Sequence, residues 1–149
     1  MSAGRHNLPQ LLGGARRWFD EGLLAALEAE GAEPVSVAQL HVFTVLDEPG
    51  TTVADLARRM GVARQTAHQA VHGLVAAGLL EQVPDPHSAR RRLIRRTAKG
   101  RRVHERAEAA IENLERALVS RIGADGVLAL REILERPWGQ PPRGRHPGT

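Results

Sequence analysis

A helix-turn-helix pattern over residues 52–78 constrains the fold of this chain more than any other feature. Thr52 and Asp55 have the Thr-x-x-Asp spacing of a capped helix start, and apolar residues follow on one helical face as far as Met60. Gly61 supplies a turn before a second helix that is expected to run to Gly78. Alanines in the second helix permit a close approach to the first. This spacing is typical of a helix pair that presents its second helix to DNA.

The outer face of the second helix carries side chains that can hydrogen-bond to base edges. They are Arg64, Gln65, His68, Gln69 and His72. Such a face is able to lie in a major groove, where each base pair presents its own pattern of donors and acceptors. We therefore expect these five residues to contact bases or groove edges.

A strongly basic segment follows this helix pair. Alternation of apolar and polar residues predicts short strands at 79–83 and 91–97, joined by a loop over 84–90 that is longer than the tightest hairpin turn. Residues 84–100 contain five arginines and one lysine against the single acid Asp85. Arg90 lies at the end of the predicted loop and is therefore expected to reach a narrow minor groove best. The negative potential of such a groove attracts a guanidinium. A helix-turn-helix followed by such a hairpin predicts a winged helix.

Apolar repeats on both sides of this block predict further helices. Residues 8–31 and 98–136 carry apolar side chains at helical spacing, and a capping box of Ser36 and Gln39 predicts another helix through Leu46. Aromatic residues make up only 3% of the chain, so the core must be aliphatic, which suits packed helices. The predicted fold class is mainly α. A winged helix-turn-helix DNA-binding block at 34–97, with its wing at 79–97, lies between N- and C-terminal helices at 8–31 and 98–136 that form a dimerisation region.

The length of 149 residues suits a single domain over 8–136, with disordered ends at 1–7 and 137–149. The absence of cysteine excludes disulfides, thiolate metal ligands and thiol-based sensing. Charged residues interrupt the first apolar stretch, so neither a signal peptide nor a membrane span is expected, and the cytoplasm is the expected location.

The charge distribution favours a polyanion as the partner. Residues 58–106 contain twelve basic and three acidic residues, whereas the net charge of the whole chain is only +4, so the remainder is acidic. A basic block between acidic helices is the pattern of a nucleic-acid-binding module with separate association elements. Phosphate contacts are expected from Arg58, Arg59, Arg91 and Arg95.

Histidines offer two alternative chemistries. His68 and His72 have the i,i+4 spacing of the zinc-binding H-E-x-x-H motif, but Gln69 stands where the catalytic glutamate would be and no third ligand is evident. No catalysis is therefore expected, and solvated surface histidines are the plain alternative. Metal sensing by His41, His104 and Glu108 is a second alternative, against which ordinary packing and solvation stand. If the helix histidines contact DNA, binding is expected to tighten as the pH falls.

Several short motifs resemble those of the multiple-antibiotic-resistance regulator (MarR) family. The resemblance covers roughly residues 8–134 by element order. Its most specific parts are an LA-x-x-x-G-V turn, an L-x-x-x-GL helix end and a DP-x-x-x-R wing that closes on T-x-x-G. The matching residues are Leu56, Ala57, Gly61, Val62, Leu74, Gly78, Leu79, Asp85, Pro86, Arg90, Thr97 and Gly100.

This resemblance implies a homodimeric transcription regulator that binds double-stranded DNA at a pseudo-palindromic operator. It further implies a repressor that is relieved by a small aromatic effector, with Trp18 and His41 as candidate pocket residues and no cofactor. Three alternatives stay open at this point: a metal-responsive regulator, a non-specific nucleoid-associated protein, and an interaction module that has lost DNA binding.

The chain also departs from the family pattern. Ser88 occupies the place of an Asp that usually braces the wing arginine, and Arg96 stands where an apolar residue is usual. Ala63 replaces the usual Ser or Thr cap of the second helix, and the loss of such a cap costs about 1 kcal/mol. Lower local stability is therefore expected. His68, Gln69 and His72 stand where Ser, Arg and Asp are commoner, so the operator cannot be transferred from relatives.

Overall fold

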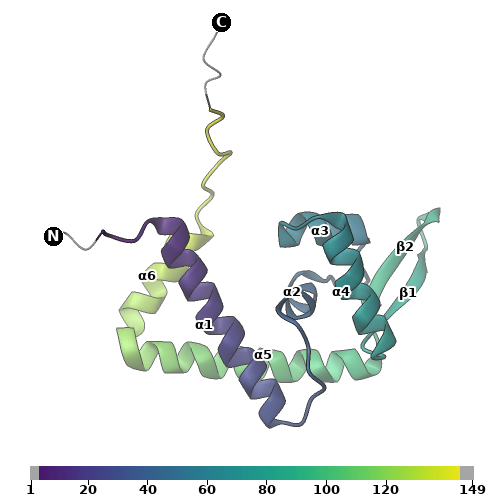
Figure 1. The fold of residues 1–149 in the computed structure, drawn as a ribbon, viewed down its shortest axis with the longest axis horizontal. Helices are drawn as coiled ribbons and strands as arrows, with labels where there is room; N and C mark the ends of the chain where they lie inside the picture. Colours follow the sequence, from purple (N-terminus) through teal and green to yellow (C-terminus); the bar gives the residue numbers. More distant parts are fainter. Residues whose placement is uncertain (1–3, 145–149) are drawn as a thin grey trace, which may run out of the picture. The chain divides into compact units, whose positions relative to one another are not determined.

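A computed structural model describes residues 4–144, which form six helices and one two-stranded sheet (Figure 1). The elements are α1 (Leu8–Ala29), α2 (Val37–Val45), α3 (Val53–Met60), α4 (Arg64–Ala76), β1 (Leu80–Asp85), β2 (Ser88–Arg96), α5 (Ala98–Ile122) and α6 (Ala124–Glu135). The prediction of a mainly helical winged helix-turn-helix is confirmed. None of the described helices combines the length and the apolar character needed to cross a membrane.

The chain separates into two compact units, the first ending at Leu114 and the second beginning at Glu115. The first contains α1 to α4, the hairpin and most of α5, and the second contains the end of α5 with α6. The disorder predicted for both chain ends falls partly on residues 1–3 and 145–149, which lie outside the described residues.

Side-chain caps explain where the first three helices begin. Asn7 and Ser36 each form a capping box, in which the cap side chain accepts from the N3 backbone N–H and the N3 glutamine accepts from the cap N–H. The Thr52 hydroxyl accepts from the Asp55 N–H at 3.2 Å. Ala63 precedes α4 without any side-chain cap hydrogen bond, as its residue type predicts.

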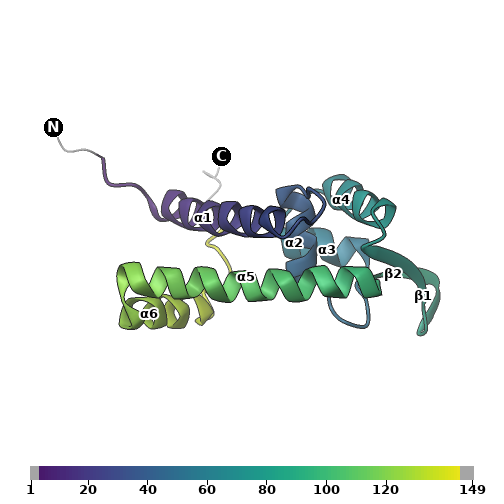
Figure 2. The ribbon, with the colours of Figure 1, turned by 90° about the horizontal axis from the view of Figure 1, so that it is seen from below.

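Two clusters of buried side chains hold the first unit together. One joins α2, α3, α4 and the hairpin through residues such as Phe43, Leu56 and Leu74. The other joins α1 and α5 through Leu23 and Ala107, with Leu40 of α2 between them. Because α2 contributes to both clusters, it connects the helix-turn-helix to α1 and α5. Figure 2 shows α2, α3, α4 and the hairpin near the start of α5.

The hairpin is tighter than the sequence predicts. Its strands pair antiparallel, and Asp85 lies opposite Ser88 across a turn at residues 86–87. The Asp85 carboxylate accepts from the His87 N–H at 2.9 Å, and this Asx-type hydrogen bond stabilises the short turn. The predicted long loop over 84–90 is therefore wrong, and Arg90 lies within β2. The register shifts between Pro84, which lies opposite Arg92, and Asp85, so residues 89–91 form an irregular segment of the strand.

The Thr-x-x-Gly motif connects the hairpin to α5. The Thr97 N–H donates to the Leu79 carbonyl at 3.1 Å, and its hydroxyl donates to the Gly78 carbonyl at 2.6 Å. The same hydroxyl accepts from the Gly100 N–H at 3.1 Å, so Thr97 caps α5. A Cβ atom on Gly100 would overlap the Leu79 carbonyl oxygen. Glycine at this position thus permits α5 to start directly against Leu79, which lies between the end of α4 and the start of β1.

Arg96 of β2 is buried, with only 4% of its surface exposed, and it contacts the end of α2. Its Nη2 donates to the Phe43 carbonyl at 2.7 Å and to the Leu46 carbonyl at 3.3 Å, while Nη1 donates to Glu48 at 3.1 Å. Burial lowers the pKa of this guanidinium, and the negative charges of Glu48 and Glu108 oppose that shift. The arginine therefore satisfies carbonyls that the end of a helix leaves without partners.

Replacing Arg96 with leucine is expected to lower the free energy of unfolding by about 2 kcal/mol, because two α2 carbonyls lose their donor. Urea unfolding followed by circular dichroism measures this change. Arg92→Leu, on the same strand but exposed, is the matched control and should stay within about 0.5 kcal/mol of the wild type. If Arg96→Leu were more stable than the wild type, the free-energy cost of burying the charge would exceed the stabilisation from its hydrogen bonds.

Candidate nucleic-acid interface

The outer face of α4 is exposed along its length, as the sequence predicts. Arg64, Gln65, His68, Gln69 and His72 are all exposed, whereas Ala67 and Ala70 on the opposite face are buried. The small alanine side chains permit α4 to pack closely on α3. A row of polar side chains on a helix that is rigidly held by its other face is suited to a major groove.

A groove of about 860 Å³ runs between the start of α3, the start of α4 and the hairpin. Its walls bring together residues from three elements. Those from α4 are Arg64, Gln65 and His68, and those from the hairpin are Gln82, Arg90, Arg91 and Arg92. Five of the predicted DNA-contacting residues therefore meet in one concave surface, and Gln69 and His72 lie farther along the exposed face of α4.

Arg92 was absent from the predicted contacts. Strand alternation places it on the side of Ile94 and Arg96, which point into the core, and this favours a buried position. Near the turn, however, no core remains to cover that side, and Arg92 is exposed. Arg92 lies opposite Pro84, next to the register shift between Pro84 and Asp85. The sequence pattern did not predict this shift.

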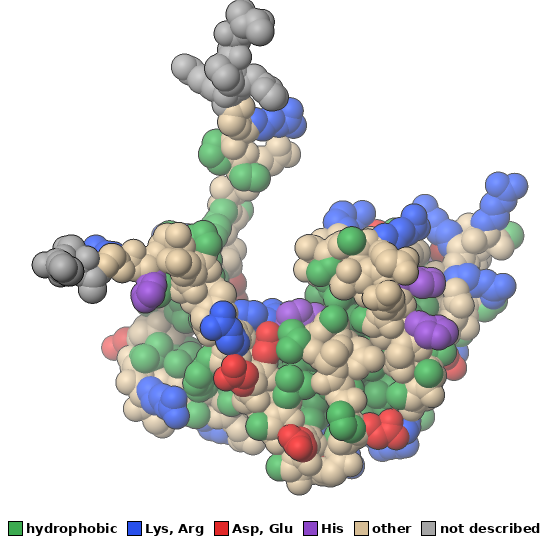
Figure 3. Space-filling model, in the orientation of Figure 1, with side chains coloured by type: hydrophobic (Ala, Val, Ile, Leu, Met, Phe, Trp, Pro, Cys, Tyr) green, Lys and Arg blue, Asp and Glu red, His purple; other side chains and the backbone are tan. Residues whose placement is uncertain are grey.

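Four arginines in this groove carry positive charge that no acid within residues 4–144 balances. No ion pair to Arg64, Arg90, Arg91 or Arg92 occurs among the described residues. In Figure 3, Lys and Arg side chains gather over the hairpin and along the edge formed by α3, with His side chains on α4 beside them. A cluster of unpaired guanidinium groups on a concave surface attracts phosphate.

The other predicted phosphate contacts are held by acidic partners. Arg58 donates to Asp55 at 2.7 Å, Arg59 to Asp47 at 2.9 Å, and Arg95 to Glu81 at 2.7 Å. Each pair reduces the net positive charge at its position. The Arg59 hydrogen bond lowers the pKa of the Asp47 carboxyl below its ordinary value of 3.8, so this pair persists at neutral pH and is lost only as the pH falls through the lowered pKa.

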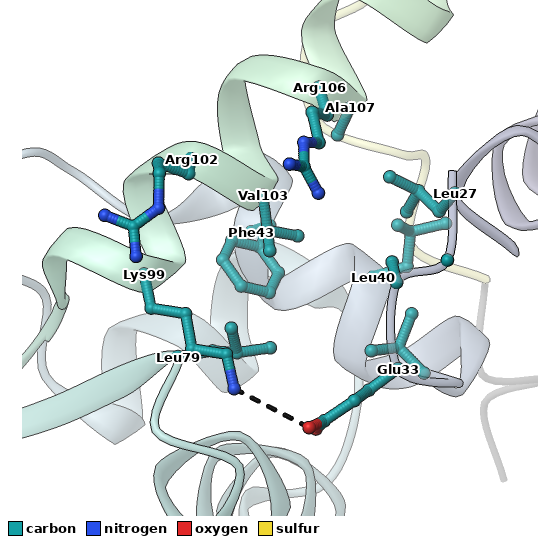
Figure 4. A pocket seen from close by; sticks show the side chains of 13 residues that line it. Leu27, Glu33, Leu40, Phe43, Leu79, Lys99, Arg102, Val103, Arg106 and Ala107 are labelled. Carbon is teal, nitrogen blue, oxygen red and sulfur yellow. Dashed lines mark ion pairs between the residues drawn. The ribbon is translucent and has the colours of Figure 1, made fainter.

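The predicted effector residues do not share a pocket wall. His41 Nε2 lies 3.2 Å from both carboxylate oxygens of Asp20 and 3.1 Å from Arg16 Nε. Trp18 packs edge-to-face on Phe19, with the ring centroids 4.9 Å apart. Neither Trp18 nor His41 lines the enclosed apolar pocket of the first unit (Figure 4).

The metal-sensing alternative receives no geometric support. His104 pairs with Glu108 at 3.0 Å, whereas His41 contacts Asp20 instead of joining them. Within residues 4–144, no three His, Asp or Glu side chains are close enough together to hold a metal ion.

Comparison with known proteins matches the helix-turn-helix block to a family. The MarR family model matches residues 34–91. A search of the curated proteins found no match.

Solved structures share the fold over most of the chain. The MarR protein of E. coli in its apo form has a TM-score of 0.70 and 20% identity, covering 89% of this chain and 97% of that one. PcaV of Streptomyces coelicolor, solved with its natural ligand, has a TM-score of 0.62 and 26% identity, covering 88% and 94%. The repressor CouR of Rhodococcus jostii RHA1, solved on a 23-mer DNA duplex, has a TM-score of 0.68 and 25% identity, covering 86% and 89%.

The matched segment contains α2, α3, α4, β1 and the start of β2, and so includes most of the residues that line the groove. The helix-turn-helix block at residues 34–91 thus matches the MarR family, and the chain shares the winged-helix fold of solved MarR-family transcriptional regulators.

Proposed function

We propose that this protein is a homodimeric, sequence-specific repressor that binds a pseudo-palindromic DNA duplex and is released by a small effector. The observation that carries the proposal is the groove between α4 and the hairpin, where Arg64, Gln65 and His68 meet three arginines that pair with no acid among residues 4–144. CouR on its DNA duplex and PcaV with its ligand support the two halves of this proposal. The target is chromosomal DNA, so the protein acts in the cytoplasm.

Within this proposal, the two walls of the groove have different roles. The α4 side chains Arg64, Gln65, His68, Gln69 and His72 read base edges in the major groove, where a bidentate arginine discriminates guanine. Arg90, Arg91 and Arg92 bind phosphate or enter the neighbouring minor groove. Arg58, Arg59 and Arg95 contribute less, because each already donates to a carboxylate.

Exposed apolar side chains support the dimer. On α6, Leu130 and Leu134 are 40% and 46% exposed, and Val127 precedes them at helical spacing. On α1, Leu8 and Leu11 are 70% and 53% exposed. Apolar side chains on separate helices are expected to be covered when two copies associate. Two copies would also place two recognition helices on successive half-sites of a pseudo-palindrome.

Two substitutions separate base reading from phosphate binding. Arg90→Ala is expected to weaken binding to all duplexes and to reduce the slope of log K against log salt by about 0.9 per lost phosphate contact. Arg64→Ala is expected to reduce the free energy of binding to the specific duplex by about 1–3 kcal/mol and to change binding to a random duplex little. Fluorescence anisotropy between about 50 and 200 mM KCl, with the duplex upstream of the protein's own gene and a random duplex, measures both effects.

Arg101→Ala is the matched control, because it removes an exposed arginine of α5 that does not line the groove. It should leave affinity and salt slope near the wild-type values. Equal affinity for specific and random duplexes would favour a nucleoid-associated protein instead, and no binding to either duplex would favour an interaction module. An Arg90→Ala protein with unchanged binding would remove the wing from the proposed interface.

A further inference from the structure

The segment after α6 carries positive charge that the proposed interface does not use. Residues 136–149, which we call the arginine arm, contain Arg136, Arg143, Arg145 and His146 and no acidic residue. Neither Arg136 nor Arg143 lines the groove between α4 and the hairpin, and neither forms an ion pair within residues 4–144. An arginine cluster without acids attracts a polyanion. The arm is therefore a candidate for a second contact with nucleic acid.

The described part of the arm, residues 136–144, is exposed and forms neither helix nor strand (Figure 1). Arg136 follows the last residue of α6 and is extended, because Pro137 disfavours a helical backbone at the residue before it. Trp138 Nε1 donates to the Ile133 carbonyl at 3.2 Å. This hydrogen bond holds the start of the arm on the last turn of α6 and leaves the following residues exposed.

Prolines favour an extended backbone in the arm. Pro141 and Pro142 directly precede Arg143. Proline fixes φ at about −65° and has no N–H to donate in a helix or a sheet. Proline-rich chains span about 3.1 Å per residue and are stiffer than glycine- and serine-rich chains. Because a stiff, extended segment loses less conformational freedom on binding than a flexible one does, a few charges suffice to bind it to a partner.

The order Arg143-Gly144-Arg145 suits the minor groove of DNA. An extended chain fits this groove, which is about 6 Å wide, whereas an α-helix needs the wider major groove. Gly144 has no side chain, and nothing lies within 4 Å of the position that a Cβ atom would take, so its backbone is free to approach the groove floor. Over runs of A·T base pairs the groove is narrow and strongly negative, and it attracts guanidinium groups.

The symmetry of the proposed dimer indicates which minor groove is free. Two copies of α4 would occupy successive major grooves on one face of the duplex. On that face a minor groove alternates with each major groove, so one minor groove lies between the two half-sites. With each hairpin on the outer side of its half-site, this central minor groove has no contact from α4 or from the hairpin.

We propose that the arginine arms of the two protomers lie in the minor groove between the half-sites, with Arg143 and Arg145 inserted over A·T base pairs. This inference rests on the proposed dimeric DNA-binding function and adds a preference for an A·T-rich spacer. The partner is DNA because α4 and the hairpin hold the duplex near the arm, at an effective concentration of about millimolar. The minor groove of duplex RNA is wide and shallow and suits an inserted arginine less well.

Fluorescence anisotropy with spacer variants of the specific duplex tests this contact. Hydroxyl-radical footprinting first locates the half-sites, and the base pairs between them are then replaced with A·T pairs only or with G·C pairs only. We expect the wild type to bind the A·T spacer at least about fivefold more tightly. In the double variant Arg143→Gln, Arg145→Gln this preference should fall below about twofold, and the affinity for the A·T spacer should fall about tenfold.

The double variant Arg101→Gln, Arg102→Gln is the matched control. It removes the same charge from two exposed residues of α5 that do not line the groove. Its preference for the A·T spacer should equal that of the wild type. This control also separates the arm from the stiffness of the DNA, because sequence-dependent bending would favour one spacer equally in all three proteins.

Equal spacer preference in the two double variants overturns the minor-groove contact. An Arg143→Gln, Arg145→Gln protein that loses the same factor on both spacers also overturns it, since that pattern indicates phosphate contact alone. Specific binding by the wild type without any spacer preference contradicts the role of the arm and leaves the proposed function intact. A wild type that binds no duplex contradicts the proposed function, and the role of the arm with it.

Discussion

Gly100→Ala is expected to destabilise the protein by about 3 kcal/mol or more and to detach the wing from α5, because the new Cβ would overlap the Leu79 carbonyl oxygen. This obstacle is backbone that accepts from the Thr97 N–H, so it cannot move away as a flexible side chain would. Urea unfolding followed by circular dichroism measures the loss. Binding to the specific duplex at the same temperature reports on the wing.

Gly13→Ala is the matched control, because Gly13 is also helical but has nothing within 4 Å of the position of a Cβ atom. Alanine is the better helix former, so this variant should be more stable than the wild type by about 0.5–1 kcal/mol. Wild-type stability of Gly100→Ala would show that α5 can shift from β1 without cost, and the explanation of the Thr-x-x-Gly motif would then be wrong.

The double variant Leu130→Glu, Leu134→Glu is expected to convert the proposed dimer to monomers at micromolar concentration, because carboxylates in a buried apolar interface have no partners. Each monomer would reach only one half-site, so affinity for the specific duplex should fall about 100-fold or more. Sedimentation velocity measures the association state. Circular dichroism checks that helical content is retained, which is expected because both side chains are exposed in the monomer.

Glu132→Lys is the control for this pair, since helical spacing places it on the other side of α6 from Val127, Leu130 and Leu134. It changes the charge of the helix and leaves the apolar stripe intact, so the dimer should persist. A double-glutamate variant that remains a dimer would exclude this stripe from the interface. A wild-type protein that sediments as a monomer would contradict the dimer altogether.

Local signals in the chain predicted most of the fold. Ser36 and Thr52 mark helix starts through hydrogen bonds to residues three positions later, so they can be recognised without tertiary contacts. The exposure of the α4 face follows from helical periodicity for the same reason. The short hairpin turn was not predicted, because it depends on an Asx hydrogen bond of Asp85. In addition, a run of arginines alternates too little between apolar and polar residues to show where the two strands stop pairing.

The candidate site was only partly predictable. Arg64 and Arg90 could be chosen from their positions, but nothing local distinguishes them from Arg59, whose acidic partner Asp47 lies in another part of the chain. Arg96 is the strongest example. Its residue type suggested a cost to stability, whereas in the fold it donates to carbonyls of α2 that lie 50 and 53 residues away in sequence.

Periodicity, caps and turn residues were therefore enough to identify a mainly helical winged helix-turn-helix, the polar face of α4 and the family motifs, because each depends on residues within a few positions of one another. The partners of individual charges depended on how the elements pack. Within residues 4–144, packing left four arginines of the groove without an acidic partner, buried Arg96 against the end of α2 and brought Lys99 to the Ala77 carbonyl at the end of α4. The energies of ion pairs and hydrogen bonds change when the distance between the two groups changes by as little as an ångström. Distances between groups that are far apart in sequence are fixed only when the chain folds.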